Sequence, residues 1–570
     1  MRLWTLAVIL LCGTMGMLTS CQHSSKADLV VYGKIYTAEG NQLAEAFAVK
    51  DGKFVYVGDK AGAEAFVTEG KTEVVDYSGQ GLVMPGCGNA HAHYSNAYGL
   101  ESSGTFIPLE TTPEQFLKEI LPEAVKKARA SGATTVSGYG WNLPKFLKDM
   151  PTRQDLDKVC SDIPIYFADN EGHKALVNTL TLVNAGIMKA DGTVLKKEMR
   201  GGEIVMGADG TPTGYLKEQA SPFVRSTLDT DKLYSVEMAK ENLPRIQERL
   251  WAEGYTMYMD GLSNYFYNNS FYQAAQELDQ EGKLQLVLGT AYEMESWMDI
   301  DEALQKAADA KKYASTRVVP NWIKLFMDGT VESGTGFTET PYPDGSHGIA
   351  NWEEQEFTDI TRKANEKGLT IHVHVMGDKG VRRVINALEK GGKKELRNTL
   401  VHVFDVFPED YKRMADNNIY VTSGVIWHHN PNTPTGDLSP VGKEDRKYPM
   451  KSFFDNGIST TIHSDYPATC GSPDDPFGIM EIAVTGVMAG EDGEPFWTEE
   501  LVTREQALAA MTINCAKQMF LENERGSIKE GKYADFLLVN KDVLTCPVNE
   551  IHEAKPTATY FEGKKVYAQQ

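Results

Sequence analysis

Apolar and polar positions alternate in two different ways along this chain. Near both ends, apolar positions recur with a period of two around turn residues, as in DLVVYGKIYT, in AEAFAVKDGKFVYVGD with its Asp51-Gly52 turn, and in GSIKEGKYADFLLVN. This pattern is typical of β-hairpins. It predicts that residues 28–81 and 521–570 form one composite β-sandwich built from both chain ends.

The middle of the chain, residues 82–520, alternates strand-like runs with helix-like segments such as PEQFLKEILPEAVKKARA. Such alternation predicts a parallel sheet with crossover helices, and the number of repeats favours a (β/α)8 barrel. The expected fold class is therefore α/β, with a TIM-like barrel. The predicted strands cover residues 135–141, 164–169, 255–260, 284–291, 321–329, 369–378, 399–406, 419–425 and 457–465.

One part of this region does not fit a minimal barrel. Residues 202–218 read as a hairpin, and we predict an inserted α/β subdomain over about residues 94–240 that covers the site. The long Gly/Pro-rich segments at 328–348 and 427–449 follow predicted strands. Barrel enzymes carry their chemistry on the face formed by such loops.

The first residues are typical of a targeting segment. Arg2 precedes a mostly apolar run, and residues 1–20 read as a signal peptide. The ending LTSC, with Cys21, resembles a bacterial lipoprotein box, which implies a lipid on Cys21, a short tether at 21–27 and a membrane-anchored protein of the cell envelope, facing the periplasm or held at the outer membrane. An ordinary signal peptide with an incidental cysteine is the alternative.

The composition limits the classes of partner that the protein can bind. The 570 residues carry a formal net charge of -22. Nucleic acids are bound by clustered Lys and Arg, so we exclude them as partners and expect a small-molecule substrate. A homodimer stays an open alternative. The five cysteines that follow Cys21 are odd in number and widely spaced, which predicts no disulfide framework.

Histidines recur at the ends of the predicted strands. His91 and His93 follow an apolar run in GLVMPGCGNAHAH, and on a continuing strand both would point to one side. His372 and His374 in IHVHVMGD repeat this spacing, and His402 lies inside the apolar LVHVF. Each could be a core residue alone, but together they favour a metal site.

Two charged residues in apolar strands strengthen that interpretation. Asp465 and His463 in TTIHSDYP are expected on one side of a strand, and a buried carboxylate is costly unless it is paired or binds a metal. Lys324 lies in NWIKLFMDG, where desolvation favours the neutral amine. A neutral amine can take up CO2 and become a carbamate that bridges two cations. A lysine that reaches solvent is the alternative.

The segments MPGCGNAHAH, IKLFMDG, HVHVMGD, HSDYP and GSIKEGKYADFLLVN, in this order, resemble the amidohydrolase superfamily, and within it amidohydrolase family 3, over about residues 28–567. The resemblance implies a metal-dependent barrel and makes 255–260 and 284–291 its second and third strands. The predicted strands at 135–141 and 164–169 then belong to the insert. The implied metal ligands are His91, His93, Lys324, His374, His402 and Asp465.

This ligand set predicts a reaction. A divalent metal, zinc before iron, manganese or cobalt, in one or two copies, would make hydroxide available. Asp465 would act as general base and then general acid, and His402 or His429 would help polarise the carbonyl. We expect hydrolysis of a C–N bond in an amide, formamide or cyclic amide. The alternatives are ester hydrolysis at the same site and a non-catalytic lipoprotein that binds a small molecule or metal.

Substrate contacts are expected from the insert and the long loops. The segment GHKALVN also resembles a recurrent family segment, so His173 is expected to reach the substrate. Glu218 is in addition a rival bridging carboxylate if Lys324 is unmodified. The predicted substrate-binding residues are Trp141, His173, Glu218, His429 and Tyr466, with Asn142 and His428 beside them.

Overall fold

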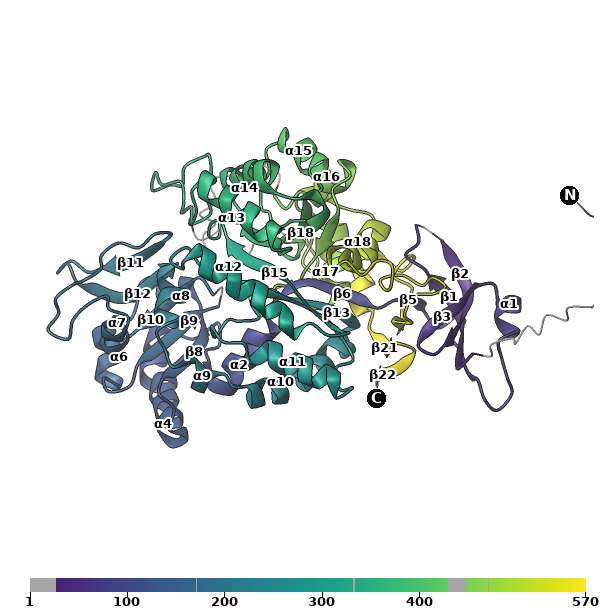
Figure 1. Ribbon diagram of the computed structural model, residues 1–570, viewed down its shortest axis with the longest axis horizontal. Coiled ribbons are helices and arrows are strands. Elements are labelled where there is room, and N and C mark those ends of the chain that lie inside the picture. The colour runs from purple at the N-terminus through teal and green to yellow at the C-terminus, as the bar shows by residue number, and fades with distance from the viewer. Residues whose placement is uncertain are drawn as a thin grey trace, which may run out of the picture.

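A computed structural model describes residues 27–40, 42–170, 172–331, 334–428, 447–469 and 471–569. Three sheets organise this part of the chain (Figure 1). The barrel lies in the centre, the sheet of the insert at one end of the molecule, and the sheet shared by the two chain ends at the other. The predicted signal peptide and Cys21 lie outside the described residues.

The central sheet is a parallel barrel. Each strand pairs in parallel with the next, and the last adjoins the first where the Asp465 backbone N–H donates to the His91 carbonyl at 3.2 Å. The TIM-like α/β fold predicted from the sequence is therefore confirmed. The strands, in order, are β6 (Cys87–Ala92), β13 (Tyr255–Asp260), β14 (Val287–Glu293), β15 (Val318–Phe326), β16 (Thr370–Val375), β17 (Thr399–His402), β18 (Tyr420–Ser423) and β19 (Thr460–Ile462).

Amphipathic helices connect the strands. In α14 (Asp378–Gly391), Val381, Ile385 and Leu388 are buried at helical spacing, so one apolar face packs inward. The other helices that precede or follow barrel strands are α10 (Val236–Glu253), α11 (Ser270–Gln280), α12 (Ile300–Asp309), α13 (Glu354–Glu366), α15 (Asp410–Asp416), α16 (Met450–Asp455), α17 (Pro476–Thr485) and α18 (Arg504–Met511).

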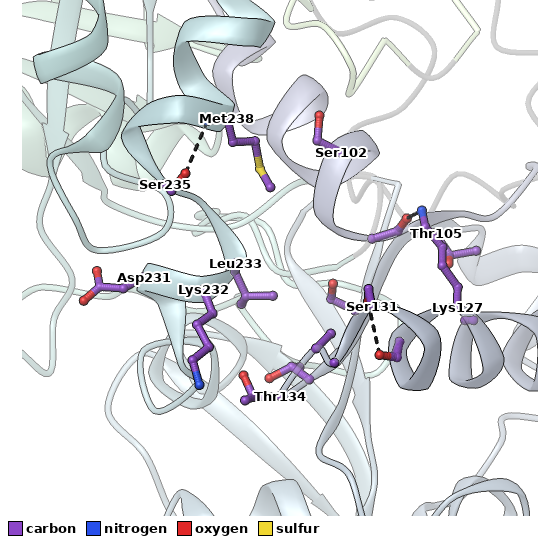
Figure 2. Close-up of a pocket in the computed structure, with 17 residues that line it drawn as sticks. Ser102, Thr105, Lys127, Ser131, Thr134, Asp231, Lys232, Leu233, Ser235 and Met238 are labelled. Carbon is purple, nitrogen blue, oxygen red and sulfur yellow. Dashed lines mark hydrogen bonds between the residues drawn. The ribbon is translucent and has the colours of Figure 1, made fainter.

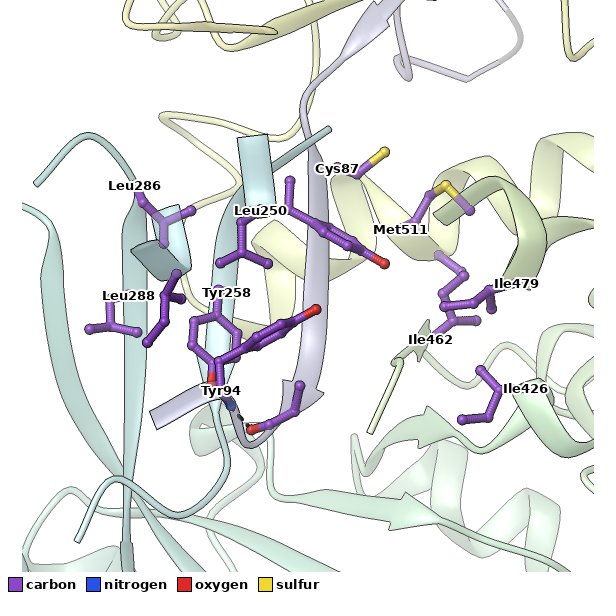
Figure 3. Close-up of a cluster of buried hydrophobic side chains, with 14 of the residues drawn as sticks. Cys87, Tyr94, Leu250, Tyr258, Leu286, Leu288, Ile426, Ile462, Ile479 and Met511 are labelled. Atoms are coloured by element: carbon purple, nitrogen blue, oxygen red, sulfur yellow. Dashed lines mark hydrogen bonds between the residues drawn. The ribbon is translucent and has the colours of Figure 1, made fainter. Parts of the chain in front are cut away.

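A large apolar cluster supports the strands that carry the first histidines. Figure 3 shows Leu250 of α10 and Tyr258 of β13 beside Cys87 and Tyr94, which lie at either end of β6. The Tyr94 backbone N–H donates to the Tyr258 hydroxyl at 2.9 Å. Packing and this hydrogen bond together hold the turn that follows β6.

The insert between β6 and β13 has its own six-stranded sheet, in the order β11-β12-β10-β9-β8-β7. The predicted hairpin is present, because β11 and β12 pair antiparallel. The strands are β7 (Thr105–Phe106), β8 (Val136–Trp141), β9 (Ile165–Asp169), β10 (Lys174–Val177), β11 (Gly202–Met206) and β12 (Pro212–Glu218), and the helices beside them include α4 (Leu121–Ser131) and α6 (Arg153–Val159).

The two chain ends share one eight-stranded sheet, joined where β5 and β20 pair antiparallel. Buried Arg525 pairs with Asp535 and with Glu562, and Glu562 also pairs with Arg317 at the start of β15. These ion pairs tie the sheet to the barrel. Its strands are β1 (Leu29–Tyr36), β2 (Leu43–Lys50), β3 (Lys53–Gly58), β4 (Glu73–Asp76), β5 (Leu82–Pro85), β20 (Phe536–Val539), β21 (Pro556–Phe561) and β22 (Lys564–Ala568).

Within the residues that the structure describes, no helix combines the length and the apolar character that crossing a membrane requires.

Candidate metal centre

Histidines and one aspartate converge where the barrel closes. The Asp465 Oδ1 atom lies 3.3 Å from the Nε2 atom of His91 and 3.3 Å from that of His93. The His91 side chain is fully buried, whereas 13% of the His93 side chain is exposed. These three residues can hold one cation from inside the barrel mouth.

Turns bring these residues together, whereas the sequence reasoning assumed strand alternation. Strand β6 ends at Ala92, so His93 lies outside it, and β19 ends at Ile462, three residues before Asp465. Asp465 has a φ of 53°, in the left-handed region. The His93 N–H donates to the Tyr466 carbonyl at 2.7 Å, which pulls the two turns together.

A second group shares the same carboxylate. His402, His463 and Asp465 each offer an atom within 4.8 Å of the others. The ring centroids of His402 and His463 are 4.9 Å apart. His402 ends β17 with a φ of 74°, which is strained for a residue other than glycine and common at functional sites.

Lys324 and His372 both contact His91. The Lys324 Nζ atom is 3.5 Å from His91 Nε2, and His372 Nε2 is 2.9 Å from His91 Nδ1. Lys324 and His372 face each other in the register of β15 and β16. His372 therefore fixes the orientation of the His91 ring. Hydrogen-bond partners of metal-binding histidines commonly have this role.

His374 lies at the edge of the cluster. Its ring centroid is 4.6 Å from that of His402, but its Nε2 atom is 3.2 Å from the Gly329 carbonyl, and it belongs to neither of the two groups that share Asp465. The structure therefore brings five of the six predicted ligands together, Asp465 and His91 among them. The sixth, His374, contacts this group through the ring of His402.

Burial favours the neutral form of several nitrogen donors. Desolvation lowers the pKa of His91, His372, His374 and His402 well below the usual histidine value, and nearby Lys324 lowers it further. Desolvation also lowers the pKa of Lys324 to about 7, although Asp465 opposes the shift. Neutral nitrogens have the free electron pairs that a metal requires.

The polar atoms of this cluster fit a divalent cation. Within the described residues, Asp465 Oδ1 and both ring nitrogens of His463 are buried without a hydrogen-bond partner. Buried polar atoms normally have one. A dication bound by carboxylate and imidazole donors would satisfy Asp465 Oδ1 and one of the two His463 nitrogens, because these are ligands that zinc prefers.

The insert brings two of the predicted substrate-binding residues to this cluster. The ring centroid of His173 is 5.1 Å from that of His374, and its Nδ1 atom is 2.8 Å from Glu218 Oε2. Tyr466 follows Asp465 and stacks on Tyr94 with ring centroids 4.7 Å apart.

Two predicted substrate-binding residues have other outcomes. Trp141 is fully buried in the core of the insert, where its indole N–H donates to the Phe167 carbonyl at 2.9 Å. The prediction placed it on the wall of the site, but its side chain packs in the core of the insert. His429 lies outside the described residues, and neighbouring His428 is buried against the Phe496 carbonyl.

The sequence reasoning did not assign a ligand role to His463 or an orienting role to His372. Both carried a usable signal, because each lies two residues before a predicted ligand, in TIHSD and IHVH. A fully buried histidine next to other buried histidines is a candidate for the same cluster.

A cavity of about 410 Å³ elsewhere contains none of the predicted site residues (Figure 2). It lies between α2 (Tyr94–Ser103), α4 and α10, and Ser102, Lys127, Lys232 and Met238 are among the residues that line it.

A parallel barrel with buried histidines and an aspartate at or just beyond its strand ends can hold the divalent metal of a metal-dependent hydrolase. The sequence comparison agrees: the model of the Amidohydrolase family, family 3 of that group, matches residues 73–567. The chain belongs to this amidohydrolase family, and it is an enzyme that acts on C–N bonds.

Relatives match along most of the chain. The N-substituted formamide deformylase of Arthrobacter pascens is 26% identical over 561 residues, which cover 94% of this chain and 97% of that protein. The protein LONG AFTER FAR-RED 3 of Arabidopsis thaliana is 24% identical over 562 residues, 95% and 91% of the two chains. An uncharacterized metal-dependent hydrolase from Pyrococcus horikoshii OT3 shares the fold, with a TM-score of 0.69, 20% identity and coverage of 91% and 99%.

Proposed function

We propose that the protein hydrolyses a C–N bond in an amide, formamide or cyclic amide with a divalent metal at the barrel mouth. The observation that carries this proposal is the meeting of His91, His93, His402 and His463 around the carboxylate of Asp465. The family supports C–N hydrolysis in general, and the relative named as a formamide deformylase supports the narrower substrate class.

The ligands we propose are His91, His93, His374, His402, His463 and Asp465, with Lys324 as a carbamate. Lys324 is fully buried and has no carboxylate within ion-pair distance among the described residues. Its neutral amine would attack CO2, forming an N–C bond and releasing one proton. The resulting anion would balance part of the charge of the metal, for which zinc is the first candidate.

A bound dication supplies a low-pKa water and polarises the carbonyl. Asp465, with only 6% of its surface exposed, would accept a proton from the attacking water while the water oxygen bonds to the carbonyl carbon. It would then deliver that proton to the leaving nitrogen as the C–N bond breaks. The products are a carboxylic acid and an amine. His402, strained at the end of β17, would help to polarise the carbonyl.

Elemental analysis tests the ligand set. The wild type, purified from bicarbonate-supplemented medium, should hold about two equivalents of transition metal per chain, and Lys324→Ala about one or fewer. Lys532→Ala is the matched control, because Lys532 is also buried but pairs with Glu39 near the chain-end sheet. No metal in the wild type after reconstitution with zinc or manganese would refute the proposal.

Activity is tested separately. The metal-loaded wild type should release amine from at least one member of a panel of N-formyl and N-acetyl amines and cyclic amides. Metal binding with no turnover of the panel would instead favour a small-molecule-binding protein.

We also propose that the protein is a lipoprotein of the cell envelope, on the basis of the LTSC motif. Cys21→Ala should move the protein from the membrane fraction to the soluble fraction and remove labelling by a radioactive fatty acid. Cys12→Ala, in the same leader segment, is the control. Equal membrane binding by the wild type and Cys21→Ala would contradict lipid anchoring.

A further inference from the structure

The insert places one histidine ring against the metal centre. His173 immediately precedes β10, and its ring contacts those of Phe326 and His374, with centroid distances of 5.9 Å and 5.1 Å. The side chain keeps 11% of its surface exposed, although its surroundings are buried. Part of the His173 side chain is therefore accessible to a small molecule.

Glu218 fixes the position of this ring through two hydrogen bonds. Its Oε2 atom is 2.8 Å from His173 Nδ1, and its backbone N–H donates to the His173 carbonyl at 2.7 Å. Glu218 itself has a φ of 46°, and a Cβ atom at Gly329 would come within 2.5 Å of its Oε1 atom. A strained residue persists only where its surroundings determine its conformation, and such residues concentrate at active sites.

Buried contacts also fix the insert on the barrel at this point. The neighbouring Gln219 donates from Nε2 to Glu295 at 2.6 Å and accepts from the Ser296 N–H at 2.8 Å, just beyond the end of β14. Arg225 pairs with Glu293 of β14 at 2.8 Å, and both side chains are at least 95% buried. The position of His173 over the metal centre therefore follows from interactions at the base of the insert.

These contacts assign the two ring nitrogens. Nδ1 is hydrogen-bonded to Glu218, which leaves Nε2 available to a second partner. We propose that this partner is the scissile amide of the substrate, so that His173 is a substrate-contacting residue and Glu218 is the positioning residue that orients it. The inference rests on the proposed function and adds that one contact to the reacting group comes from the insert.

The same geometry gives Glu218 a role other than bridging two metals. Its Oε2 atom is engaged by His173 Nδ1, and its Oε1 atom lies beside Gly329. Lys324 contacts His91 directly, so the position between the ligands is already taken by a lysine.

Substitutions that differ in hydrogen bonding test the contact. His173→Phe keeps a ring of similar size without nitrogens and should lower kcat/KM for the best amide substrate by about a hundredfold, the effect of removing one hydrogen bond to the reacting group. His173→Gln keeps an amide that can donate or accept and should lose about tenfold or less. Glu218→Leu should lower kcat/KM as much as His173→Phe does. Glu218→Gln keeps an acceptor for Nδ1–H, so its kcat/KM should lie between that of Glu218→Leu and that of the wild type.

The matched control is a second histidine–glutamate pair among the described residues, with the same distance between Nδ1 and Oε2. His552 Nδ1 is 2.8 Å from Glu481 Oε2, between α17 and the C-terminal segment, away from the metal ligands. His552→Phe should leave kcat/KM within about twofold. Bound metal per chain is measured for every variant and should stay at the wild-type level, because His173 is not a ligand in this proposal.

Binding of acetohydroxamate, a small amide-like chelator, tests the contact without turnover. His173→Phe should weaken binding to the metal-loaded protein about tenfold, and His552→Phe should not. Loss of metal from His173→Phe, or equal effects of Phe and Gln at position 173 on kcat/KM and on binding, would overturn the inference. Absence of turnover in the wild type with intact chelator binding would overturn the proposed function but not this contact.

Discussion

Replacing Lys324 with methionine should stabilise the metal-free protein while removing its function. Lys324 is fully buried at the centre of the metal ligands, and desolvation lowers its pKa from 10.5 to about 7. Methionine has a similar length and no charge, so the variant removes the cost of burying an ammonium group but also removes the proposed carbamate. Stability and metal binding should therefore change in opposite directions.

The sign and size of the stability effect follow from linkage. Between pH 7 and 10.5 the unfolded chain binds more protons at Lys324 than the folded chain does, so the free energy of unfolding of the wild type rises with pH. At about 1.4 kcal/mol per pKa unit, protonated Lys324 destabilises the folded state by about 5 kcal/mol below pH 7. Lys324→Met lacks this contribution. Its stability advantage should be largest below about pH 7 and should narrow by about 2 kcal/mol between about pH 7 and pH 9.

The assay is guanidinium unfolding of both proteins, without metal and without bicarbonate, at a series of pH values. Lys306→Met on α12, whose side chain is 58% exposed, is the control and should show no pH-dependent difference from the wild type. A stability difference between Lys324→Met and the wild type that stays constant with pH would refute a buried, titrating amine at this position.

Three further predictions use other parts of the structure. Asp465→Asn should lower kcat/KM at least about a hundredfold with unchanged circular dichroism, since the amide cannot shuttle the proton; nearly normal turnover would exclude Asp465 as the base. Gly261→Ala should weaken metal binding at least about tenfold in a chelator competition, because the added Cβ would lie 2.3 Å from His91 Cε1; unchanged affinity would show that the ring position is not critical. Arg525→Met should lower the free energy of unfolding by about 3–5 kcal/mol, because it leaves the Asp535 carboxylate, only 4% exposed, without its cation; a loss under about 1 kcal/mol in urea unfolding would contradict this role.

Sequence reasoning recovered the barrel because its signal is local and repeated. Each β/α unit has its own apolar run and its own amphipathic helix, as α14 shows with Val381, Ile385 and Leu388 on one face. Charged or polar residues inside apolar strands, such as Lys324 and His372, were also visible, because their burial is costly enough to require a reason.

Strand ends were predicted less well. The strand predicted to run to residue 465 ends at Ile462, and the one predicted to run to residue 406 ends at His402. The alternation of side chains along a strand places both members of a His-x-His or His-x-Asp pair on the same side. This holds only as long as the strand continues through both residues. The backbone of Asp465 has a left-handed conformation, and this residue reaches the cluster through a turn that no local sequence pattern predicts.

The sequence by itself determined which side chains are buried and chemically active, because burial follows from periodicity and its cost follows from charge. Tertiary structure decided which of them meet. His463 joins the cluster, Trp141 turns into the core of the insert, and His173 crosses from the insert to the barrel mouth. Each outcome depends on barrel closure and on the seating of the insert, and these are set by contacts between residues far apart in the chain, such as Asp465 with His91 and Gln219 with Glu295.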